Sequence, residues 1–74
     1  MNSDTVRAIR VSTGQSQVAF ARSIGVAGST IAAVESYQRD VSDRLAHLIK
    51  QHYGADPDVL EAIRREREFD KMTL

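Results

Sequence analysis

Apolar residues recur at helical spacing in several short segments of this chain, and capping residues or glycines bound each segment. In the first, Val6 and Ile9 face inward, Ser3 or Asp4 is the expected N-cap, and Gly14 ends the helix. No segment alternates apolar and polar residues with β-branched enrichment, so no strand is predicted. The pattern therefore predicts an all-α protein.

Two short helices with a glycine between them are predicted in the middle of the N-terminal half. Ser16 is a favourable N-cap, and Gly25, which readily adopts positive φ, ends the first of the two. The expected inward side chains of this helix share one side of it: Val18, Phe20, Ala21 and Ile24. The helix that follows, over about residues 28–36, is expected to bury Ile31 and Val34.

Two more helices complete the predicted fold. Ser42 caps a fourth helix that ends at Gly54, and Asp56 with Pro57 opens a fifth. The apolar face of the fourth helix is made of Leu45, Leu48, Ile49 and Tyr53. We expect a single domain over residues 1–74, with a core at about 5–63 and a helical tail at 64–74.

The tail carries charged pairs at helical spacing, Glu61–Arg65 and Arg64–Glu68, which are typical of a solvated helix face. Its apolar residues are too irregular for a heptad seam: Leu60, Ile63, Phe69, Met72 and Leu74. They either pack on the bundle or form a second contact surface.

The two central helices and the glycine turn between them follow the helix-turn-helix pattern. Gly25 stands where the chain reverses, and Ala21 is small where the helices cross. The run "SQVAFARSIGVAGSTIAAVE", residues 16–35, resembles the phage-repressor and Cro type of helix-turn-helix protein, the XRE family. The resemblance covers about residues 5–63 and implies a compact, lambda-repressor-like five-helix bundle that reads double-stranded DNA.

The same resemblance assigns roles to individual residues. It implies that Arg10 pairs with Glu35 and so joins the first helix to the third. The implied base-facing positions are Ala27, Gly28, Ser29 and Ala33. The implied or candidate phosphate contacts lie at the start of the second helix and around the third: Ser16, Gln17, Arg22, Thr30, Gln38, Arg39 and Arg44. A helix N-terminus supports phosphate binding through its free N–H groups.

The chain departs from the family pattern in three ways. The base-facing set contains no Arg, Lys, Asn or Gln, the side chains that make bidentate base contacts. Ala27 occupies a place where the family usually has a Ser or Thr cap, and Tyr37 a place where it often has glycine. Tyr37 either covers the core or faces a partner. These departures favour an alternative in which the module binds a protein.

Charge and composition narrow the possible partners. The net charge of the chain is zero, but the charges are unevenly distributed. Residues 1–39 carry four arginines and two carboxylates, a net charge of +2, whereas residues 40–74 carry six basic and eight acidic side chains, a net charge of −2. The N-terminal half is therefore the expected anion-facing half. No cysteine, signal pattern or apolar run of about 18 residues is present, so we expect a cytoplasmic protein without membrane association.

The residues provide little support for a metal site, a KH domain or an enzyme. His47 and His52 lie roughly 140° apart around a helix, so they share no metal-binding face, and we expect neither a metal nor a cofactor. The "GVAG" run matches the GxxG loop of KH domains, but that fold needs strands. No nucleophile–base pair indicates an enzyme. Two functions stay open: a DNA-binding regulator that binds an inverted repeat as a homodimer, and an antirepressor or antitoxin-like module that binds another regulator, such as a repressor protein.

Overall fold

The computed structural model describes residues 1–72, and these residues form five α-helices and no strand. The helices are α1 (Ser3–Ser12), α2 (Gln17–Ile24), α3 (Gly28–Glu35), α4 (Asp43–Tyr53) and α5 (Pro57–Met72). The predicted all-α five-helix bundle is confirmed. Within residues 1–72 no single helix is long and apolar enough to cross a membrane; α2 and α3 meet that requirement only as a pair bent by 120°.

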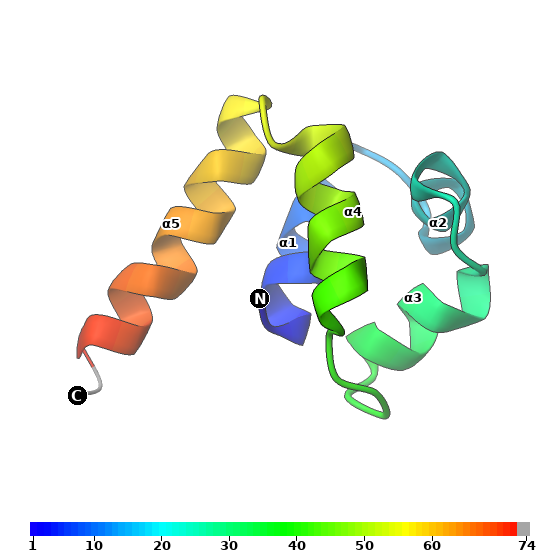
Figure 1. The fold of residues 1–74 in the computed structure, drawn as a ribbon, viewed down its shortest axis with the longest axis horizontal. Helices are drawn as coiled ribbons and strands as arrows, with labels where there is room; N and C mark the ends of the chain where they lie inside the picture. The colour runs from blue at the N-terminus through cyan, green and yellow to red at the C-terminus, as the bar shows by residue number, and fades with distance from the viewer. Residues whose placement is uncertain (73–74) are drawn as a thin grey trace.

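The helices are arranged around α1, which packs against α3 on one side and α5 on the other. Figure 1 shows α1 behind α4, with α2 and α3 on the right and α5 on the left. α2 packs against both α3 and α4. The central part of the chain, α2 to α3, thus lies on the opposite side of the molecule from α5.

Local capping chemistry sets the helix starts. The Ser16 and Ser42 hydroxyls accept hydrogen bonds from the backbone N–H groups three residues on, each at 3.1 Å, as the sequence predicts. Asp56 does the same for α5, since its carboxylate accepts from the N–H of Asp58 at 2.9 Å. These bonds satisfy helix N–H groups that have no partner within the helix.

The N-cap of α1 differs from the prediction of Ser3 or Asp4. Asn2 is the cap: its backbone is extended and its side-chain oxygen accepts from the N–H of Thr5 at 2.8 Å. Ser3 and Asp4 are already helical. Asparagine, serine and aspartate cap about equally well, so three adjacent candidates could not be separated by residue type alone.

The core contains side chains from all five helices. Its buried apolar members are Val6, Ile9, Phe20, Ala21, Ile24, Ile31, Val34, Leu45, Ile49 and Val59. Val26, Leu48, Tyr53 and Ile63 are partly buried against them. The ring of Phe20 stacks on that of Tyr53 with centroids 5.4 Å apart, which joins α2 to the end of α4. The inward residues expected from the sequence are confirmed, with one exception.

That exception is Val18, whose predicted place in the inward stripe of α2 is wrong. Val18 is 58% exposed, whereas Phe20 is completely buried. Residues two apart on a helix point about 200° away from each other, so both cannot face the core. The larger aromatic side chain takes the inward position, and Val18 lies on the surface beside Gly28 at the start of α3.

Tyr37, in the loop after α3, faces outward and covers no core residue. It is 71% exposed and has a left-handed backbone with φ of 64°, a conformation that favours glycine. Its hydroxyl donates a hydrogen bond to the carboxylate of Asp4, and this bond raises the pKa of Tyr37. The contact ties the α3–α4 loop to α1.

The charged pairs of the tail are present as predicted. Arg65 contacts Glu61, Arg64 contacts Glu68, and Arg64 also bonds Glu61 three residues before it. All of these side chains are exposed or half-buried, so the pairs decorate a solvated face. Leu60 and Phe69 are exposed while Ile63 packs partly on the core; the Met72 side chain and Leu74 lie outside the described residues.

Candidate nucleic-acid interface

A three-residue turn, 25–27, joins α2 to α3 and bends the chain direction by 120°. Gly25 has φ of 79°, and its N–H bonds back to the last turn of α2. The N–H of Val26 then bonds the carbonyl of Ala21 at 2.9 Å. Glycine is needed here because L residues rarely adopt this left-handed backbone, and the turn residues close the end of α2 without help from side chains.

The start of α3 has no side-chain cap. Ala27 has the extended backbone of an N-cap, but it offers no oxygen to the first N–H groups of the helix. The N–H of Thr30 is satisfied by the Ala27 carbonyl at 3.0 Å. The first turn of α3 therefore lies at the surface, with Gly28 half-buried and Ser29 exposed. An alanine at the N-cap position predicts this lack of a side-chain cap.

None of the eleven candidate DNA contacts is buried. The exposed ones are Ser16, Arg22, Ala27, Ser29, Gln38, Arg39 and Arg44. The half-buried ones are Gln17, Gly28, Thr30 and Ala33. A surface that includes the first turns of both α2 and α3 is thus open to a partner.

Arg10 and Glu35 form a pair that fastens α3 to α1. Nε of Arg10 donates to Oε2 of Glu35 at 2.7 Å, and Nη2 donates to Oε1 at 2.9 Å. Nη1 of Arg10 donates to the carbonyl of Gln15 at 2.9 Å, in the loop before α2. The two side chains are only 17% and 5% exposed. A two-pronged contact of this kind fixes orientation as well as distance.

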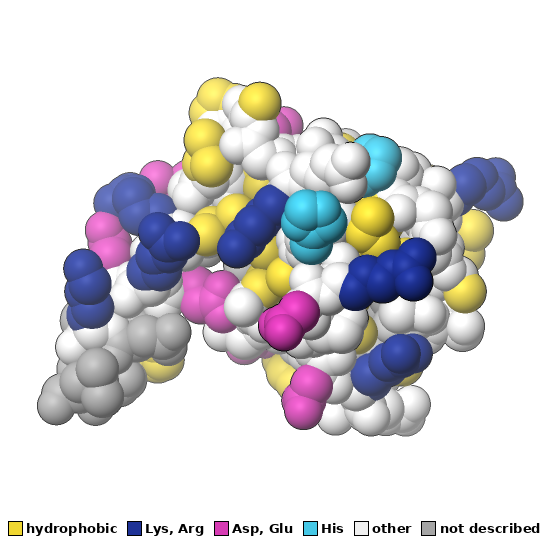
Figure 2. All heavy atoms as spheres, in the orientation of Figure 1, with side chains coloured by type: hydrophobic (Ala, Val, Ile, Leu, Met, Phe, Trp, Pro, Cys, Tyr) yellow, Lys and Arg dark blue, Asp and Glu magenta, His cyan; other side chains and the backbone are white. Residues whose placement is uncertain are grey.

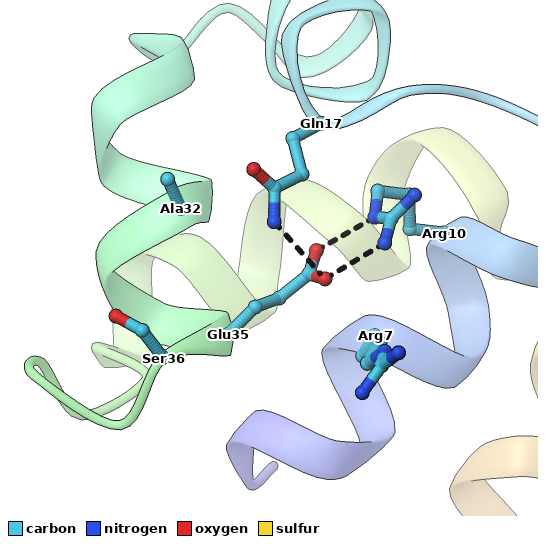
Figure 3. A pocket seen from close by; sticks show the side chains of 6 residues that line it. All are labelled: Arg7, Arg10, Gln17, Ala32, Glu35 and Ser36. Carbon is cyan, nitrogen blue, oxygen red and sulfur yellow. Dashed lines mark hydrogen bonds and ion pairs between the residues drawn. The ribbon is translucent and has the colours of Figure 1, made fainter.

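Gln17 takes part in the same cluster. Its amide nitrogen donates to Oε1 of Glu35 at 3.4 Å, and Figure 3 shows Gln17 and Arg10 pointing at the carboxylate from two elements. Burial raises the pKa of Glu35, but the hydrogen bonds from Arg10 and Gln17 outweigh it, and the pKa is lowered overall. Glu35 is held as a carboxylate that positions the first residue of α2.

Arg7 belongs to this cluster, although the sequence reasoning did not select it. A groove of about 260 Å³ is lined by Arg7, Arg10, Gln17, Ala32, Glu35 and Ser36 (Figure 3). Arg7 is exposed and close enough to Glu35 to help lower the pKa of that carboxylate. The sequence pattern could have identified Arg7, because residues 7 and 10 are three apart on a helix and therefore share one of its faces.

The other cationic candidates come from separate elements. Arg22 lies in the last turn of α2, about 7.5 Å along the axis from Gln17, Arg39 in the loop after α3, and Arg44 in the first turn of α4. On the face drawn in Figure 2, the dark blue side chains over α2 to α4 stand apart from one another. The structure brings Gln17 next to the Arg10–Glu35 pair, but it does not gather these arginines into one cluster.

Among the side chains that the structure describes, no group of three or more His, Asp or Glu residues is placed to hold a metal ion. Comparison of the chain with known proteins finds no matching family model, no matching curated protein and no matching solved structure.

Proposed function

We propose that this chain is a small helix-turn-helix regulator of transcription, a cytoplasmic protein that binds an inverted-repeat site in double-stranded DNA as a homodimer. The observation that carries the proposal is the α2–turn–α3 unit. Helix-turn-helix motifs join two helices at about 90–120° through a turn of three or four residues that often contains glycine. The 120° bend and the turn at residues 25–27 agree with both features.

In this proposal α3 enters the major groove, and the first turn of α2 contacts the phosphate backbone. Gln17 supplies a side-chain donor, and Ser16 supplies a hydroxyl at the capped end of α2. The Arg10–Glu35 pair holds α3 against α1, so the two contact points keep a constant spacing. Arg7 adds a positive charge beside Gln17.

Base recognition by this surface relies on small side chains. Ala27, Gly28 and Ala33 offer no hydrogen-bonding side chain, so Ala27 and Ala33 contribute contacts to thymine methyl groups. Ser29 supplies one hydrogen bond that either a donor or an acceptor on a base satisfies. We expect modest discrimination between sequences, with most of the affinity coming from phosphate contacts.

A salt series tests the proposal. Affinity for duplexes from the native locus is measured by fluorescence anisotropy between about 50 and 200 mM salt. Two to four phosphate contacts per protomer, or four to eight per dimer, give a slope of roughly −4 to −7 in a plot of log K of the dimer against log salt. Gln17→Ala and Arg22→Ala weaken binding to all sequences alike, and Ser29→Ala changes the preference at one base position. Arg65→Ala, on α5 at the far side, is the matched control.

A second candidate function has one observation in its favour. Val18 is exposed at the crossing of α2 and α3, next to Gly28, where an apolar side chain has no use in phosphate binding. A module that binds another regulator protein, in the manner of an antirepressor or antitoxin, would use Val18 with the small residues of α3. If the chain has this second function, it does not bind DNA even at low salt, and Ala33→Glu abolishes its complex with the regulator protein without unfolding the chain. Salt-sensitive binding to DNA by the isolated chain excludes this second function.

A further inference from the structure

A groove between α4 and α5 is lined by none of the candidate DNA contacts. Its volume is about 580 Å³, and it is lined by Lys50, Gly54, Leu60, Ile63, Arg64 and Arg67. In Figure 1, α5 runs away from α4 below the turn that joins them, and α2 and α3 lie on the other side of α4. The residues that line the groove come from α4, from α5 and from Gly54, the residue that ends α4.

The groove has an apolar floor. Leu60 is 50% exposed although it stands one residue after Val59, a fully buried core residue. Ile63 is partly buried against the core, and Gly54 has no side chain to fill the upper end. Leu60, Ile63 and Arg67 lie on one face of α5 at the spacing i, i+3 and i+7. An exposed apolar strip with a polar rim is typical of a binding surface.

Three cationic side chains line the groove, and the Glu66 carboxylate stands beside two of them, because Lys50, Glu66 and Arg67 line an adjoining hollow. Lys50 contributes from α4, and Arg64 and Arg67 contribute from α5. Arg64 is already paired with Glu61 and Glu68. Among the side chains that the structure describes, no ion pair involves Lys50 or Arg67. Figure 2 shows yellow side chains in this hollow, with dark blue ones at its edges and magenta ones at its lower end.

We propose that this groove binds an acidic amphipathic helix of a partner protein. The apolar side chains of that helix contact Leu60 and Ile63, and its carboxylates pair with Lys50 and Arg67. A groove between two helices fits a helix that presents anchors at i, i+3, i+4 and i+7. Charge complementarity selects an acidic partner. A second copy of the chain that used the same face would bring like charges together, and a DNA backbone would leave the apolar floor uncovered. The inference goes beyond the proposed function and does not depend on it.

The test uses a fluorescein-labelled helical peptide with leucines at i, i+3, i+4 and i+7 flanked by glutamates. Fluorescence anisotropy follows its binding to the full chain. We expect roughly micromolar affinity, the range of small interfaces that depend on a few contacts. Two control peptides, one with lysines for the glutamates and one with serines for the leucines, do not bind.

Variants of the protein locate the site. Lys50→Glu with Arg67→Glu, and separately Leu60→Ser, each weaken peptide binding at least ~10-fold. The matched controls are Arg22→Glu with Arg44→Glu, which makes the same charge change elsewhere, and Phe69→Ser, which removes an exposed apolar side chain that does not line the groove. The controls keep wild-type affinity. Circular dichroism shows that each variant is folded before it is compared.

Four results overturn the inference. The first two are failure of the acidic peptide to bind and an equal loss of peptide affinity in the control variants. The other two are a dimer, seen in sedimentation, that Leu60→Ser dissociates, and a loss of DNA binding when the charges of Lys50 and Arg67 are reversed. The last two assign the groove to a second copy or to nucleic acid. Because the groove lies away from the residues tested for DNA binding, the failure of either proposal leaves the other intact.

Discussion

The Arg10–Glu35 pair gives the sharpest test of how this fold is held together. Glu35→Ala removes the acceptor of two short hydrogen bonds and leaves the Arg10 guanidinium only 17% exposed without a counter-charge. Breaking a fully buried pair costs about 3–5 kcal/mol. Because Arg10 is partly solvated and keeps its bond to the Gln15 carbonyl, we expect Glu35→Ala to lower the free energy of unfolding by less than this, by about 2–3 kcal/mol.

Removing both charges together is less costly than removing one. Arg10→Met with Glu35→Leu replaces the pair by apolar side chains of similar volume, a change that is often neutral. The bond from Arg10 to Gln15 is also lost, which adds about 1 kcal/mol. The double variant is therefore expected to be more stable than Glu35→Ala by about 1–2 kcal/mol.

Urea and thermal unfolding followed by circular dichroism measure these differences. A loss of about 2–3 kcal/mol lowers the Tm of a domain this small by roughly 8–24 °C. If Glu35→Ala is unfolded at room temperature, Glu35→Gln, which keeps the shape and one hydrogen-bonding oxygen, replaces it in the comparison. Changes within about 0.5 kcal/mol for all variants would show that the two residues are only surface neighbours, and the reasoning would fail.

Two further predictions concern acid stability and the turn. Since the pKa of Glu35 in the folded protein is lowered from 4.5, its contribution to stability is complete above pH 4.5 and is lost as the pH falls through the lower value. Glu35→Gln therefore flattens the acid dependence of urea unfolding; parallel curves for wild type and variant contradict this. Gly25→Ala, at φ of 79°, destabilises by about 1–2 kcal/mol, and Gly25→Asn by less. Equal unfolding midpoints for the two variants would exclude backbone strain as the cause.

Part of the site follows from residues that act locally. Ser16 as a cap needs only its own hydroxyl and an N–H three residues away. Gly25 ends α2 because of its own backbone freedom. The Arg10–Glu35 pair spans 25 positions in the sequence, and there the family resemblance, rather than local pattern, provided the prediction. Its geometry, and the addition of Arg7 and Gln17 to the cluster, come from the way α1, α2 and α3 meet.

The helices follow from the amino-acid sequence: their number, approximate ends and most inward residues result from caps, glycines and a period near 3.6, which act within a few residues. Which of two side chains on opposite sides of α2 is buried depends on the packing of the whole fold, which buries Phe20 and leaves Val18 exposed. The contact of Tyr37 with Asp4 and the groove that Lys50, Arg64 and Arg67 line between α4 and α5 also arise only in the folded chain. These outcomes depend on the directions in which helices cross, and no local pattern encodes those directions, because they result from the packing of all core side chains at once.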